Sequence, residues 1–159
     1  MAAGCSIGGG GSTPTAEVDD SNPPPATNVS ILRQKPMDAY VSLGGTIKRC
    51  WFSPVDGLLP AYVYRADVSP DGNKVQISVH QKIELGRAGV KTYVIDFNQS
   101  GGSTVISTQN LKMPPDMAAK MQFDLNRWKT GASDCSKEMP PAAGAAPAGA
   151  KSAAKPKPN

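Results

Sequence analysis

Residues 75–85 read VQISVHQKIEL, and this stretch decides the fold. Apolar side chains recur at every second position from Val75 to Leu85, with Gln81 as the one interruption. The alternation predicts a β-strand with one buried face, because successive side chains of a strand point to opposite sides. The intervening side chains form a solvent-facing row, which we take as a candidate partner surface: Gln76, Ser78, His80, Lys82 and Glu84.

Three further strands are predicted around this one, at residues 61–68, 92–97 and 104–108. Each contains alternating apolar or aromatic side chains. The connections are short and rich in Gly, Pro and Asp, as in the SPDG turn at residues 69–72. Short connections between consecutive strands imply antiparallel neighbours. The pattern therefore predicts a four-stranded antiparallel meander.

Two amphipathic helices flank the predicted meander. Apolar positions recur at spacings of three and four, which is typical of a helix with one buried side: Met37, Tyr40, Val41, Gly44, Ile47 and Trp51. A second helix follows Pro114 and runs to Lys129. Its apolar stripe consists of Ala118, Met121, Leu125 and Trp128. We expect both helices to cover the same face of the sheet, giving a two-layer α+β sandwich with the order α-β-β-β-β-α.

Composition divides the chain into three parts. Gly and Pro, with 16 and 15 residues, are concentrated toward the two ends. Segments so poor in large apolar residues cannot offset the entropy lost on ordering. We therefore expect one globular domain at residues 29–135, between a disordered linker at 1–28 and a disordered Ala/Pro/Lys tail at 136–159.

Two of the three cysteines frame the predicted core. Cys50 ends the first helix, and Cys135 lies just after the second. In a two-layer arrangement these helix ends converge at one edge of the sheet, so we predict a disulfide between them. A disulfide favours an oxidising compartment. The alternative is two buried free thiols in a cytosolic protein.

The third cysteine lies near the start of the sequence, in the run Ala2-Ala3-Gly4-Cys5, and is followed by a Gly/Ser linker. This run resembles the lipobox of bacterial lipoproteins. The resemblance implies a lipid anchor on Cys5 and a periplasm-facing place in the cell envelope, at the outer membrane rather than the inner one. It covers about six residues. The sequence departs from the pattern at Ala2, where Leu is usual, and in lacking the hydrophobic segment that precedes a lipobox. The resemblance therefore implies a coding sequence that starts upstream of Met1. The alternative is an ordinary small-residue N-terminus with a free thiol.

The sequence offers little for catalysis. A triad of Ser78, His80 and Asp96 would lie on an open face without a pocket or oxyanion donors. No Cys-x-x-Cys pair exists, and the single histidine is far from the cysteines in sequence, which argues against a metal site. We therefore expect a non-enzymatic protein with no cofactor.

Three functions stay open from the sequence. The first is a lipid-anchored envelope protein whose domain binds a protein partner or a cell-wall component. The second is a soluble nucleic-acid-binding protein with a basic tail, although a net charge of +4 is modest for that class. The third is a protein that holds a hydrophobic small ligand between helices and sheet. Nucleic acid is the less favoured partner, because sheets that bind it display exposed aromatic rings.

Overall fold

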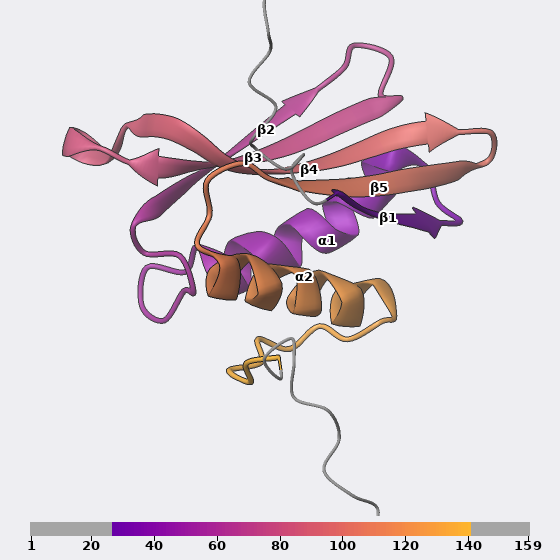
Figure 1. The fold of residues 1–159 in the computed structure, drawn as a ribbon. Helices are drawn as coiled ribbons and strands as arrows, with labels where there is room; N and C mark the ends of the chain where they lie inside the picture. Colours follow the sequence, from indigo (N-terminus) through magenta and orange to yellow (C-terminus); the bar gives the residue numbers. More distant parts are fainter. Residues whose placement is uncertain (1–26, 141–159) are drawn as a thin grey trace, which may run out of the picture.

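The computed structural model describes residues 27–140, which form a sheet with two helices on one side of it (Figure 1). The elements follow in the order β1 (Thr27–Leu32), α1 (Pro36–Trp51), β2 (Tyr62–Val68), β3 (Lys74–Lys82), η1 (Glu84–Gly86), β4 (Ala88–Ser100), β5 (Ser103–Asn110) and α2 (Pro115–Lys129). The element η1 is a short 3-10 helix. Every strand pair is antiparallel, so the predicted α+β class with an antiparallel sheet and two helices is confirmed.

The sheet has five strands rather than the predicted four. Its order is β1-β5-β4-β3-β2, so the meander is complete and β1 adds to its far edge beside β5. The actual order of elements begins with a strand, ahead of α1. The prediction missed β1 because the alternation of Val29, Ser30 and Ile31 is too short to identify a strand by periodicity. In the structure Val29 and Ile31 are more than 60% exposed. Backbone pairing with β5, a long-range interaction, makes this segment a strand.

Strand β3 is shorter than the alternation over residues 75–85 predicted. Strand β3 ends at Lys82, and the chain then enters η1, where Leu85 adopts φ 59° and is 96% exposed. Ile83, expected on the buried face, is 44% exposed. The pairing of β3 with β4 also shifts register on both sides of His80. Irregular pairing at this end therefore stops the strand before the apolar pattern stops.

The helix α1 buries a slightly different stripe from the one expected. Ile47 and Trp51 are fully buried as predicted, whereas Met37 and Val41 are 40% and 64% exposed. Ala39 and Leu43 take the inner positions instead. In α2 the predicted Met121, Leu125 and Trp128 are buried.

The core lies between the helices and the inner face of the sheet. Strands β3 and β4 supply Val75, Ile77, Val79, Tyr93, Ile95 and Phe97, all at most 2% exposed. Trp51 of α1 packs against Trp128 of α2 with ring centroids 5.4 Å apart, which joins the two helices. Burial of aromatic side chains dominates the energetics of a core this small. The opposite face of the sheet is not covered by either helix (Figure 1).

Candidate functional site

The predicted partner surface is divided by the structure. Gln76 and Ser78 lie within β3, on the face of the sheet away from the helices, and Ser78 is only 2% exposed. His80 is half-buried at the irregular end of the strand. Lys82 is the last residue of β3 and donates to the Pro60 carbonyl at 2.8 Å, and Glu84 is exposed in η1. These five side chains therefore do not form one continuous row.

Ser78 and His80 do approach one another. The ring Nε2 of His80 is 3.0 Å from the Ser78 hydroxyl, while Nδ1 is 3.0 Å from the Gly89 carbonyl. Asp96 accepts a hydrogen bond from Gln76 at 2.7 Å instead of orienting the imidazole. A triad needs a carboxylate on the second ring nitrogen of the histidine. The arrangement is a hydrogen-bonded patch of the sheet and not a Ser-His-Asp triad.

The structure joins Cys50 to Cys135 by a disulfide bond that spans 85 positions of sequence. Cys50 is 7% exposed at the end of α1, whereas Cys135 is exposed after α2. The bond therefore ties the last turn of α1 to the segment that follows α2. We call residues 133–139 the C-terminal strap.

The C-terminal strap is held by several side chains besides the disulfide. Arg49 donates to the Ser133 carbonyl at 2.6 Å, and the indole N–H of Trp128 donates to the Asp134 carbonyl at 3.0 Å. Arg127 contacts both carboxylate oxygens of Asp134 at 2.8 Å. The hydrogen bond between them lowers the pKa of Asp134 and raises the pKa of Arg127. The strap therefore has a defined path across the ends of both helices.

Beneath the strap lies a buried ion pair on α2. Lys120 donates to Asp124 at 2.5 Å, and the two residues are 2% and 3% exposed. The strap completes the pair, since Lys120 also donates to the Ser136 carbonyl at 2.7 Å. The second oxygen of Asp124 accepts from the Trp51 indole at 3.1 Å. The pair therefore connects α2 with both α1 and the strap.

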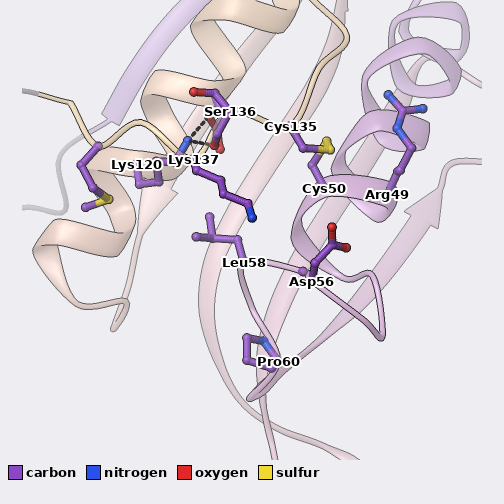
Figure 2. Close-up of a pocket in the computed structure, with 12 residues that line it drawn as sticks. Arg49, Cys50, Asp56, Leu58, Pro60, Lys120, Cys135, Ser136 and Lys137 are labelled. Atoms are coloured by element: carbon purple, nitrogen blue, oxygen red, sulfur yellow. Dashed lines mark hydrogen bonds and ion pairs between the residues drawn. A yellow bond between two sulfur atoms is a disulfide. The ribbon is translucent and has the colours of Figure 1, made fainter.

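A pocket of about 400 Å³ opens beside this pair and the disulfide (Figure 2). Its residues come from the end of α1, the α1–β2 loop, α2 and the strap: Arg49, Cys50, Asp56, Gly57, Leu58, Pro60, Lys120, Asp124, Cys135, Ser136, Lys137 and Met139. Lys137 extends from the strap toward Leu58 (Figure 2). The lining thus combines charged and apolar side chains, which is typical of a small-ligand site.

Sequence periodicity alone does not single out this pocket. Lys and Asp four positions apart are ordinarily an exposed helical pair. The sequence contains one indication that this pair is buried. Lys120 and Asp124 directly precede Met121 and Leu125 and so lie beside the apolar stripe of the helix. Their burial depends on the strap, whose position cannot be read from the sequence. The pocket is therefore a product of tertiary structure.

The predicted lipid site, Cys5, lies outside the described residues, as do most of the predicted linker and tail. Within residues 27–140, no helix is long and apolar enough to cross a membrane. The same described range contains no cluster of three or more His, Cys, Asp or Glu side chains that could hold a metal ion.

Comparison with known proteins yields no family. No protein-family profile and no curated protein matches the sequence. Among solved structures, an 18 kDa protein from Caulobacter crescentus aligns over 66% of this chain and 87% of that chain, at 11% identity and a TM-score of 0.21. A likeness at this level carries no argument about fold or function.

Proposed function

We propose that this protein is a non-enzymatic binding protein of the bacterial cell envelope, held to a membrane by a lipid on Cys5. Its α+β domain binds a protein partner or a cell-wall component on the periplasmic side, at the outer membrane rather than the inner one. The Cys50–Cys135 disulfide is the observation that carries the proposal. Disulfides persist in the periplasm and are rare in the cytosol, so this bond agrees with the compartment that the lipobox-like run implies.

The placement of the aromatic rings supports a protein or cell-wall partner over nucleic acid. Tyr93 and Phe97 are at most 2% exposed and face the helices. Tyr64 lies on the same inner side, where its hydroxyl donates to that of Tyr40 at 3.2 Å. Sheets that bind single-stranded nucleic acid stack bases on exposed rings. The uncovered face offers polar side chains instead, among them the exposed Arg65 and the half-buried Gln76.

Metabolic labelling with a radioactive fatty acid tests the lipid anchor. The gene, with its natural upstream DNA, is expressed in a bacterial host as wild type, as Cys5→Ala and as Ser6→Ala. We expect label in the wild type and in Ser6→Ala, and none in Cys5→Ala, because only the thiol of Cys5 accepts the lipid. Absence of label from all three proteins would contradict the proposed anchor. Label in Cys5→Ala would place the lipid elsewhere and contradict the assignment of Cys5.

A further inference from the structure

We propose that the pocket beneath the C-terminal strap binds a carboxylate monoanion that carries an apolar body. This inference rests on the proposed function only in treating the domain as a binding protein, and it is independent of lipid attachment. It names the ligand chemistry that the pocket of Lys120, Lys137 and Leu58 would recognise.

The pocket lining includes a buried ammonium group. Lys120 is 2% exposed, so its side chain is held in place by its neighbours. An ammonium has three N–H donors. Within the described residues, Lys120 has two hydrogen-bond acceptors, Asp124 and the Ser136 carbonyl. The third N–H has no hydrogen-bond acceptor among the described residues, and the Nζ atom lies 5.5 Å from the centre of the Phe123 ring. An anion in the pocket that Lys120 lines would supply that acceptor.

The net charge of the pocket lining favours a ligand with a single negative charge. Three cations, Arg49, Lys120 and Lys137, face two carboxylates, Asp56 and Asp124, which leaves one positive charge. A monoanion neutralises that charge. A doubly charged phosphate would exceed the one surplus positive charge of the lining. It would leave one negative charge uncompensated beside two carboxylates. Like charges brought together in a partly desolvated site are unfavourable.

The apolar part of the lining suits an apolar body. It consists of Leu58 and Pro60 of the α1–β2 loop, Met139 of the strap and the disulfide itself. Met139 is 57% exposed, so a ligand would cover apolar surface that now faces water. A volume of about 400 Å³ lies in the range of small-molecule sites and accommodates a group of dipeptide size. Two sources share this chemistry: a free organic acid, and the C-terminal carboxylate of a peptide.

Binding can be measured by two-dimensional ¹H–¹⁵N NMR on the full, non-lipidated chain with its disulfide formed. The probes are N-acetyl-Ala-Ala, the C-terminal amide of the same peptide, propionate and inorganic phosphate. We expect the free acid to shift amide signals of Gly57, Leu58 and Ser136 in a saturable manner, and the amide to bind at least about fivefold more weakly. If propionate binds with the same affinity as N-acetyl-Ala-Ala, the natural ligand is a free acid. If N-acetyl-Ala-Ala binds more tightly, the natural ligand is the C-terminus of a peptide.

Lys137→Gln provides the matched variant, because Lys137 is exposed and its loss leaves the core intact. Loss of one rim charge should weaken N-acetyl-Ala-Ala about two- to fivefold, as is typical of a solvent-exposed charge. Lys91→Gln, an exposed lysine of β4, should leave the affinity unchanged. Equal shifts by the acid and the amide, tighter binding of phosphate, or no saturable shift with any probe would overturn the inference. These results do not depend on fatty-acid labelling, so failure of either proposal is recognisable by itself.

Discussion

At the scale of single residues, the ion pair of Lys120 and Asp124 is the least expected feature of the core. Both charges are removed from water, and their attraction must offset the loss of hydration. Additional hydrogen bonds make this feasible: the Trp51 indole donates to Asp124, and the Ser136 carbonyl accepts from Lys120. The pair therefore adds little net stability by itself, but leaving either charge without its partner would be unfavourable.

A double-mutant comparison tests this reasoning. We expect Lys120→Met to lower the free energy of unfolding by about 3–5 kcal/mol, because it leaves the Asp124 carboxylate buried without its cation. Adding Asp124→Leu removes the uncompensated charge and should restore part of that loss. The Trp51 indole N–H then lacks an acceptor, so a deficit of about 1–3 kcal/mol should remain. Urea unfolding followed by tryptophan fluorescence measures all three proteins, and a double variant less stable than Lys120→Met would contradict the account.

At the scale of elements, β1 is the strand that depends most on its neighbours. It lies at the edge of the sheet, and most of its side chains are exposed. Lys129 of α2 donates to the Ser30 hydroxyl at 2.9 Å. Thr104 of β5, which is fully buried, donates to the Gln34 carbonyl at 2.6 Å just after the strand. These two contacts and the pairing with β5 hold the segment in place.

Replacing Thr104 tests how β1 is held. Thr104→Val keeps the side-chain shape but removes the donor to Gln34, so we expect a loss of about 1–3 kcal/mol in the free energy of unfolding. Amide exchange of β1 should accelerate more than that of β3, since the lost contact is local to the β1–α1 connection. Thr104→Ser retains the hydroxyl and serves as the control for hydrogen bonding. Equal acceleration of β1 exchange in both variants would show that the hydroxyl does not hold the strand.

At the scale of the whole molecule, the disulfide closes a loop that contains most of the domain. The 85-position separation of Cys50 and Cys135 encloses four of the five strands and α2. A cross-link of this span restricts the unfolded chain strongly. It also keeps the strap over the Lys120–Asp124 pair, so the same bond contributes to stability and to the shape of the pocket.

Removing the disulfide should therefore have a large effect. We expect Cys50→Ala combined with Cys135→Ala to lower the free energy of unfolding by about 4–5 kcal/mol, a large fraction of the 5–15 kcal/mol typical of small domains. Wild type reduced with a phosphine should lose a similar amount, because the cross-link is absent in both. Urea unfolding of both proteins provides the measurement. A loss below about 1 kcal/mol in both would mean that the bond does not restrict the unfolded chain as argued.

The sequence by itself determined the α+β class, the antiparallel meander and the two helices. These follow from local periodicity and from the packing of apolar faces, which neighbouring residues specify. The Cys50–Cys135 disulfide was expected because two-layer packing brings the two helix ends together, and the structure contains that bond. The lipobox-like run at Cys5 also comes from the sequence alone, and it stays a prediction.

Only the tertiary structure decided the fifth strand, the early end of β3 at Lys82 and the pocket. The strand β1 exists because β5 offers it backbone partners, and its apolar Val29 and Ile31 stay exposed instead of entering the core. Lys120 is buried because the strap, which follows α2 in the chain and is held by the disulfide, covers it. Such features depend on contacts between segments far apart in the chain, and the spacing of residues within one segment does not encode them.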